Sequence, residues 1–179
     1  LALWHALSLQ NKQVTVYLPD PAPEMYSFVP GFREIKYSQP NPANFAVSVL
    51  LDSTYLERTH LADAIRSHPR SICIDHHHDN RGECTYNLIV PSAAATAQII
   101  TILFAQTQTP ITKDIATCLL TGIFTDTGSF MHDSTTPEIL KIAAHLMRKG
   151  ARLSHIAHET YQKKGLASLK IWGKALSRI

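Results

Sequence analysis

Two short runs of mainly apolar residues, each followed by an aspartate, constrain the fold of this chain most strongly. The first run spans 45–51 and precedes Asp52, and the second spans 71–74 and precedes Asp75. Neither run alternates regularly between apolar and polar residues, as a strand with one solvent-facing side does. Unbroken runs of this kind are typical of strands covered on both faces. The pattern therefore predicts an α/β fold with a parallel sheet.

Further elements are expected on both sides of these runs. Helices are predicted for residues 1–10 and 61–67, and strands for residues 14–18 and 85–90. The chain after Pro91 is predicted to be helical, with N-caps at Ser92 (for a helix from Ala93), Thr112 and Thr136, and with Gly150 ending the third helix. We therefore expect a parallel sheet with flanking helices over 1–150, followed by a mostly helical segment over 151–179.

The composition excludes several classes of protein. Of the 179 residues, 45% are hydrophobic and 17% are charged, which is ordinary for a globular domain. A net charge of +3 suits an anionic substrate without indicating a dedicated nucleic-acid-binding protein. No apolar run approaches the roughly 18 residues of a membrane span. The cysteines Cys73, Cys84 and Cys118 lack the spacing of a disulfide framework or a zinc site, so we expect a reducing, cytoplasmic location.

Both predicted strands end in side chains that bind metals. Ligands of parallel sheets bind beyond the carboxyl ends of the strands, which is where Asp52 and the run Asp75-His76-His77-His78 lie. An aspartate here also caps turns, and for Asp52 alone the turn is the commoner explanation. Three histidines after a buried strand are harder to explain by packing, and imidazole is the commonest metal-binding side chain.

A third polar position follows a predicted helix. Continuing the apolar spacing of that helix places Asp126 on its buried face, where a carboxylate needs a hydrogen bond, a paired charge or a metal. The alternative is that the helix ends before Thr125 and that Asp126 belongs to a turn. Carboxylates and imidazole without thiolates favour Mn²⁺ or Mg²⁺ over structural zinc. Two such ions, about 3.5–4 Å apart, would activate a water for attack on phosphorus.

The ordered set of motifs resembles the DHH phosphoesterase superfamily. The resemblance is carried by Leu50-Leu-Asp52-Ser, Ile74-Asp75-His76-His77, Pro91-Ser-Ala-Ala-Ala-Thr96-Ala and Gly122-Ile-Phe-Thr-Asp126-Thr-Gly-Ser-Phe130. Together these segments cover most of the chain. The similarity is greatest to the branch of nanoRNases and pAp phosphatases, in which the last segment is followed by a Thr-Pro-Glu helix and a Lys-Gly turn, as at 136–138 and 149–150 here.

The resemblance implies roles for individual residues. Asp52 corresponds to a carboxylate that bridges two manganese ions, and His76 and Asp126 correspond to further metal ligands. Asp75 corresponds to a group that orients the histidine pair and belongs with His77 to the catalytic set. His77 and His78 correspond to residues that face the scissile phosphate, so both are expected to bind substrate, and His78 is also expected to be catalytic. Independently of the resemblance, His132 follows the Asp126 turn and is expected from this position to bind substrate.

The same resemblance implies two parts that are not found in this sequence. One is the first family motif, a histidine followed by Asp-x-Asp, which supplies the other metal ligands. The other is a C-terminal substrate-binding domain, toward which 151–179 would serve as a helical linker. We therefore expect a DHH domain over 1–150 that lacks its first motif. We also expect the 179-residue chain to be inactive alone.

The expected activity is hydrolysis of short oligonucleotides, of 3′-phosphoadenosine 5′-phosphate, or of both. Three alternatives remain: a cyclic-dinucleotide phosphodiesterase, a manganese-dependent pyrophosphatase, and a catalytically dead DHH scaffold. The first two share the metal chemistry. The third is opposed by the presence of Asp52, His76, His77 and Asp126. The expected partners are nucleotides and a second copy of the chain in a homodimer, with no membrane.

Overall fold

Three parallel strands form the sheet that was expected from the apolar runs. In this computed structural model, which describes residues 1–163 and 166–178, the strands are β1 (Ser48–Leu51), β2 (Ser71–Asp75) and β3 (Tyr86–Ile89). Their order is β1-β2-β3, and both pairs are parallel. The last residue of β1 lies opposite Ile74, so the chain leaves β1 and β2 at the same edge of the sheet. The predicted α/β class is confirmed.

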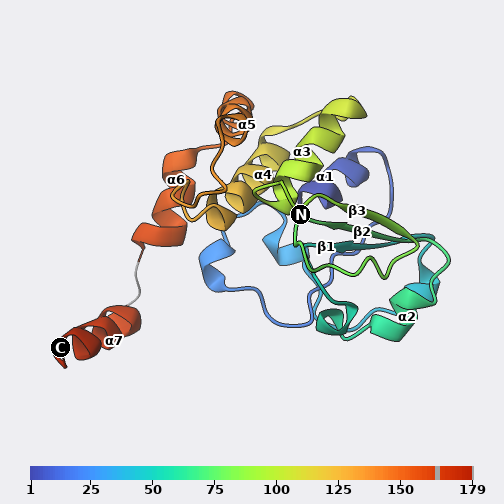
Figure 1. Cartoon of the computed structure of the whole chain (residues 1–179), viewed down its shortest axis with the longest axis horizontal. Helices are drawn as coiled ribbons and strands as arrows, with labels where there is room; N and C mark the ends of the chain where they lie inside the picture. The colour runs from blue at the N-terminus through green and yellow to red at the C-terminus, as the bar shows by residue number, and fades with distance from the viewer. Residues whose placement is uncertain (164–165, 179) are drawn as a thin grey trace.

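Helices cover this sheet and continue to the end of the described chain. Their bounds are α1 (Ala2–Leu9), α2 (Ala62–Arg66), α3 (Thr96–Gln106), α4 (Lys113–Asp126), α5 (Pro137–Arg148), α6 (Leu153–Ala157) and α7 (Leu166–Leu176), with a π-helical turn at His158–Gln162. Helices α1, α3 and α4 gather on one side of the sheet, and α2 lies toward the other side (Figure 1). The chain after 150 is mostly helical, as predicted.

The main core is centred on α4. Its residues Ile115, Leu119, Leu120 and Ile123 are at most 2% exposed, and they recur at the three- and four-residue spacing of one helix face. Burial of each such side chain stabilises the fold by about 1.5–3 kcal/mol. This face packs with α1, α3 and α5 into one apolar cluster.

Strand β2 is buried on both faces, which explains its unbroken apolar sequence. Ile74 belongs to the main core under the helices. Cys73 points to the other side and joins a smaller cluster with Leu56, Ile65 and Cys84. The two clusters clamp β2 from opposite faces and hold its carboxyl end, where the polar residues begin, in a fixed position.

The predicted strand at 14–18 is wrong. This segment makes only one isolated parallel bridge, between Tyr17 and Lys36. A strand needs a neighbour with which to form a ladder of hydrogen bonds. Between this segment and β1 lies instead an apolar cavity, lined by Val16, Leu18 and Leu51 among others. The run at 45–51 is also shorter than predicted, because only Ser48–Leu51 pairs with β2.

The helix predicted to begin at Ala93 begins three residues later. Ala95 is extended, with φ −163° and ψ 150°, and serves as the N-cap of α3 without a side-chain hydrogen bond. Ala93 belongs instead to a turn in which its N–H donates to Val90 O at 2.9 Å. The Ser92 cap is therefore wrong. Local capping preference is overridden here by a turn that brings Ala93 and Thr96 to the edge of the sheet.

The other two predicted caps are confirmed. The hydroxyl of Thr112 accepts a hydrogen bond from Ile115 N at the start of α4. The hydroxyl of Thr136 accepts one from Ile139 N at the start of α5, with Pro137 as the first helical residue. Gly150 follows the end of α5 with a left-handed φ of 104°, as a glycine after a helix commonly does.

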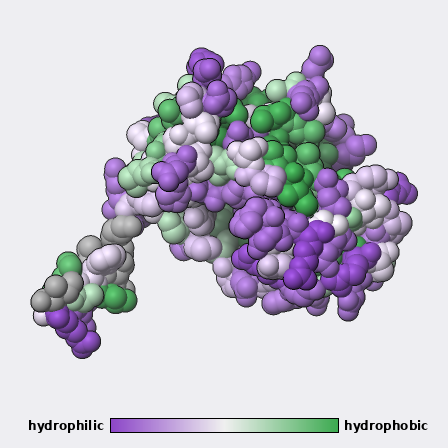
Figure 2. Space-filling view, in the orientation of Figure 1, coloured by the Kyte–Doolittle hydropathy of each residue, from purple (hydrophilic) through white to green (hydrophobic). Residues whose placement is uncertain are grey.

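The surface differs between the two sides of the sheet. Figure 2 shows hydrophobic surface over the helical layer and a largely hydrophilic surface around α2. Within the described residues, no helix combines the length and the apolar character needed to span a membrane.

Candidate metal centre

The carboxyl ends of β1 and β2 bring the first two candidate ligands together. The two strands are neighbours, and Asp52 N donates to Ile74 O at 3.1 Å, which extends their ladder by one residue. Asp52 has a left-handed φ of 56°, a conformation that Asp tolerates better than most residues. In this conformation Asp52 Oδ1 lies 3.5 Å from His76 Nε2. The two strand ends therefore share one site.

The third candidate comes from the end of α4. Asp126 is the last residue of this helix, and its Oδ2 lies 3.1 Å from the same nitrogen, His76 Nε2. Asp126 is therefore a helical residue and not part of a separate turn. Its side chain is 38% exposed, against 17% for His76 and 54% for Asp52, so the cluster opens to solvent. Segments 74 residues apart in sequence thus converge on one imidazole nitrogen.

A hydrogen bond from the other ring nitrogen of His76, Nδ1, determines the tautomer of this imidazole. His76 Nδ1 lies 3.1 Å from the carbonyl oxygen of Ala93, which only accepts hydrogen bonds. Nδ1 is therefore the protonated nitrogen, as in the arrangement that commonly orients metal-binding histidines. In the neutral imidazole the lone pair is then on Nε2, the atom that faces both carboxylates.

The electrostatics of this cluster favour a cation. Burial raises the pKa of Asp126, and the negative charge of Asp52 raises it further, while His76 and His77 oppose the shift. Within residues 1–163 and 166–178, neither Asp52 nor Asp126 is paired with a lysine or an arginine. Two carboxylates that converge on an imidazole nitrogen without a lysine or arginine partner fit a hard or borderline divalent ion.

Asp75 lies beneath this cluster and has no exposed surface. Its Oδ1 accepts from His77 Nδ1 at 2.7 Å and from His76 N at 2.8 Å, and its Oδ2 accepts from Asn80 Nδ2 at 2.6 Å. Atoms of Asp52, Asp75, His76 and His77 all lie within 4.8 Å of one another. The oxygens of Asp75 are already occupied by protein donors, however, which leaves Asp52, His76 and Asp126 as the open side of the group.

Burial raises the pKa of Asp75, but the hydrogen bonds from Asn80, His77 and the backbone outweigh it and lower the pKa overall. The hydrogen bond to Asp75 in turn raises the pKa of His77. The ring of His77 is 4.6 Å from that of His76, centroid to centroid, and its side chain is 38% exposed. Asp75 thus holds His77 beside His76 and favours the charged imidazolium.

The other two predicted histidines lie around this group. His78 is exposed at the start of the loop that follows β2. His132 is fixed by a hydrogen bond between its Nδ1 and the backbone oxygen of Asp126 at 3.1 Å. Three successive residues with positive φ, Gly128, Ser129 and Phe130, turn the chain back so that His132 reaches this carbonyl. The structure therefore places His132 next to the Asp126 ligand position.

Sequence comparison gives the family to which this arrangement belongs. Residues 1–123 match the DHH family, N-terminal domain. The chain belongs to the DHH family. The similarity inferred from its ordered motifs is thereby confirmed.

Two relatives and one solved structure extend this result to most of the chain. The bifunctional oligoribonuclease and PAP phosphatase NrnA of Thermus thermophilus is 34% identical over 181 residues, covering 100% of this chain and 53% of the relative. The NrnA of Mycoplasma pneumoniae is 27% identical over 64% of this chain and 36% of its own length. An exopolyphosphatase-related protein from Bacteroides fragilis superposes with a TM-score of 0.87 and 28% identity, over 98% of this chain and 55% of that one. The chain thus spans about half the length, or less, of these relatives.

Two residues of this DHH site were not assigned a role from sequence. Asn80 donates to Asp75 Oδ2, to Ser53 O at 3.1 Å and to Cys73 Sγ at 3.5 Å, and so joins the ends of β1 and β2. Thr96 donates to Asp52 Oδ1 at 2.8 Å. In the sequence, Asn80 could have been noticed as an asparagine close to the histidine run. Thr96 could have been noticed as the threonine within a motif otherwise made of small residues.

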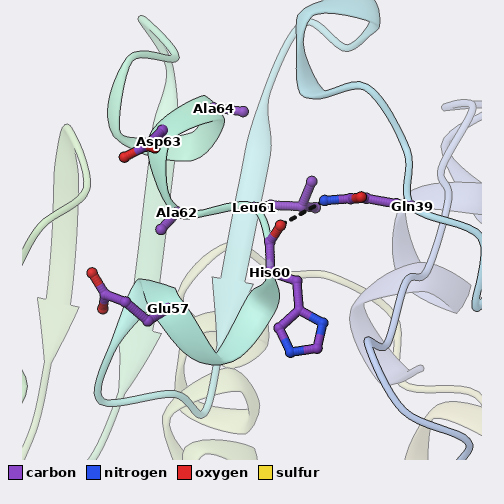
Figure 3. A pocket seen from close by; sticks show the side chains of 7 residues that line it. All are labelled: Gln39, Glu57, His60, Leu61, Ala62, Asp63 and Ala64. Carbon is purple, nitrogen blue, oxygen red and sulfur yellow. Dashed lines mark hydrogen bonds between the residues drawn. The ribbon is translucent and has the colours of Figure 1, made fainter.

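A hollow elsewhere on the surface contains none of the candidate ligands. It is lined by residues of the segment between β1 and β2 together with one from an earlier loop: Gln39, Glu57, His60, Leu61, Ala62, Asp63 and Ala64 (Figure 3). Gln39 Nε2 donates to His60 O across it at 2.5 Å. This hollow is therefore separate from the cluster of Asp52, His76 and Asp126.

Proposed function

We propose that this DHH-family protein is a metal-dependent phosphoesterase that acts on short oligonucleotides and on 3′-phosphoadenosine 5′-phosphate. The observation that carries the proposal is the approach of Asp52 and Asp126 to His76 Nε2, at 3.5 and 3.1 Å. Two carboxylates without a lysine or arginine partner among the described residues suit a divalent ion, and we propose Mn²⁺, with Mg²⁺ as the alternative.

We expect some of these residues to bind the metal and others to orient the groups that contact the substrate. Asp52, His76 and Asp126 would hold the metal, with two ions expected once further ligands are present. Such ions lower the pKa of a bound water and neutralise the charge on phosphoryl oxygens during displacement. The buried Asp75 orients His77 and does not itself reach the surface.

The histidines around the metal position would contact the phosphate. His77 is favoured as an imidazolium by Asp75, and a charged imidazolium donates from both nitrogens. Its Nε2 would therefore donate to a phosphate oxygen while Nδ1 stays on Asp75. His78 and His132 lie in the loops that follow β2 and α4, and would contribute further donors to an anionic substrate.

The substrate class is supported by relatives that are similar over long stretches. The NrnA proteins of Thermus and Mycoplasma are named as oligoribonucleases and PAP phosphatases, and the Thermus protein aligns with the whole of this chain. Cytoplasmic location, a homodimer, and flanking parts that complete the metal and substrate sites remain predictions.

The test is hydrolysis by the complete gene product with Mn²⁺. Release of mononucleotides from a 5′-phosphorylated dinucleotide, and of phosphate from 3′-phosphoadenosine 5′-phosphate, is expected. Removal of Mn²⁺ with a chelator should abolish both. The 179-residue chain alone is expected to be nearly inactive, because two ions need more ligands than the open side chains of Asp52, His76 and Asp126.

Variants identify the site in the same assay. His76→Ala and Asp126→Asn are expected to lower activity by more than about 100-fold, since even groups that only support a metal ligand cost roughly 10–100-fold when removed. His145→Ala, on α5 and outside the cluster, is the matched control and should retain activity. Full activity of His76→Ala, or no activity of the intact protein on either substrate, would contradict the proposal.

A further inference from the structure

One of the motifs that mark this chain as a DHH protein contacts the candidate ligands but supplies none of them. It is the segment of small residues over 91–97, which connects β3 to α3. Two of its residues contact candidate ligands that come from two different strands. The Ala93 carbonyl accepts from His76 Nδ1, and Thr96 Oγ1 donates to Asp52 Oδ1. Both contacts depend on the turn at Ala93, because of which α3 begins only at Thr96.

Asp52 needs external support more than the other candidate ligands do. Its side chain is 54% exposed, and its backbone has positive φ, so neither packing nor an ordinary strand conformation fixes the carboxylate. Among the residues that the structure describes, Thr96 provides the one hydrogen bond that this carboxylate accepts. A carboxylate has about four lone-pair positions, so one donor orients it and leaves acceptor capacity for an ion.

Thr96 is itself well fixed. It is 6% exposed and is the first residue of α3, whose next turns pack in the main core. The Thr96 hydroxyl is therefore held by a rigid helix, and it contacts the half-exposed carboxylate of Asp52, which packing does not fix. A supporting group of this kind holds a metal ligand close to its binding geometry before the ion arrives, which lowers the cost of binding.

We propose that Thr96 is a positioning residue of the metal centre, which fixes the carboxylate of Asp52 for the divalent ion. The inference rests on the proposed function, because it assumes that Asp52 binds metal. It adds a specific role for the 91–97 motif: through Ala93 and Thr96, this segment aligns ligands from β2 and β1 with each other.

A purely structural role for the hydroxyl is the competing explanation, and the same helix offers a control. Thr101 is 5% exposed, and its hydroxyl donates to Ala97 O at 2.8 Å within α3, without contact to a ligand. Thr96→Val and Thr101→Val each replace a buried hydroxyl with a methyl group of similar shape. Only the first change removes a donor from Asp52. Thr96→Ser retains this donor.

The experiment measures binding of Mn²⁺ to the complete gene product, by calorimetry and by the loss of the free-Mn²⁺ paramagnetic resonance signal, with thermal unfolding recorded in parallel. Thr96→Val is expected to weaken Mn²⁺ binding by roughly 10–100-fold, the usual effect of removing a group that supports a ligand. Thr96→Ser should bind nearly as the wild type does. Thr101→Val should keep its Mn²⁺ affinity even where its thermal stability falls.

Asp52→Ala and His76→Ala separate the two ways in which this experiment can fail. If both lose Mn²⁺ binding while Thr96→Val binds as the wild type does, Thr96 has no positioning role and the metal site stands. If Thr96→Val and Thr101→Val weaken binding equally, the effect is structural and the inference is overturned. If Asp52→Ala binds as the wild type does, or the wild type binds no Mn²⁺, the metal site proposed here is wrong and the role of Thr96 is lost with it.

Discussion

Asp75 is a carboxylate without exposed surface, and its charge is retained because protein donors replace water. An unpaired buried carboxylate would be protonated instead, since desolvation disfavours the charged form. Here His77, Asn80 and the His76 backbone supply donors, and the net effect lowers the pKa of Asp75. The stability of this group and the orientation of His77 therefore depend on the same few atoms.

Substitution of Asn80 tests how much the buried Asp75 carboxylate depends on its protein donors. Asn80→Ala leaves Asp75 Oδ2 without its side-chain donor and releases the contacts to Ser53 O and Cys73 Sγ. We expect a loss of about 1–3 kcal/mol in the free energy of unfolding, the cost of leaving a buried acceptor unsatisfied. Urea denaturation measures it. Asn44→Ala, at an exposed position, should change stability by no more than about 0.5 kcal/mol; an equal effect of both changes would contradict this assignment.

The pKa of His77 predicts a pH dependence of stability in the metal-free chain. Its pKa is raised above the ordinary 6.5 by Asp75. The stabilising contribution is therefore fully present below pH 6.5 and is lost as the pH rises through the higher pKa of the folded state. Compared with wild type, His77→Gln should show a smaller loss of stability above pH 6.5, measured by urea denaturation in the presence of a chelator. Parallel pH profiles for the two proteins would contradict this expectation.

The secondary-structure elements show which features sequence could predict. The apolar run of β2 identified a sheet strand because burial on both faces leaves a direct sequence pattern, as Cys73 and Ile74 show. The similar run of β1 is only partly buried, and Val49 is 38% exposed. The threonine caps were predictable because capping is a local interaction. The segment 14–18 has the composition of a strand, but pairing depends on a neighbour, and composition cannot show whether one is present.

The same distinction applies to the candidate site. The position of Asp52 and His76 followed from parallel strands that end at one edge. The placement of Asp126 depended on helix phase and length, which left helix and turn open until the structure was known. The bond from Thr96 to Asp52 joins residues 44 apart through an irregular turn, and no periodic pattern encodes such a contact.

The cap of α5 offers a test of one local prediction. Thr136→Ala removes the acceptor for Ile139 N, and we expect a loss of about 1 kcal/mol in unfolding free energy. The adjacent Thr135 is a matched control, because its hydroxyl oxygen is buried and has no hydrogen-bond partner within the described part of the chain. Thr135→Ala should therefore be neutral or stabilising in thermal or urea unfolding. A larger loss for Thr135→Ala than for Thr136→Ala would refute the assignment of the cap.

The candidate metal centre joins parts of the fold that are otherwise separate. Asp52 comes from the end of β1, His76 from the end of β2, and Asp126 from the end of the central core helix α4. Two packed clusters fix β2, and the core fixes α4, so the open side of the cluster is presented by rigid elements. An ion at this point would link the sheet to the helical layer.

Anomalous diffraction from crystals grown with Mn²⁺ shows whether an ion links β1, β2 and α4 in this way. The expected result is a manganese peak in direct contact with His76 Nε2 and with carboxylate oxygens of Asp52 and Asp126, and no such peak in crystals of His76→Ala. A manganese peak bound away from these three side chains, or no peak in wild-type crystals at millimolar Mn²⁺, would contradict it.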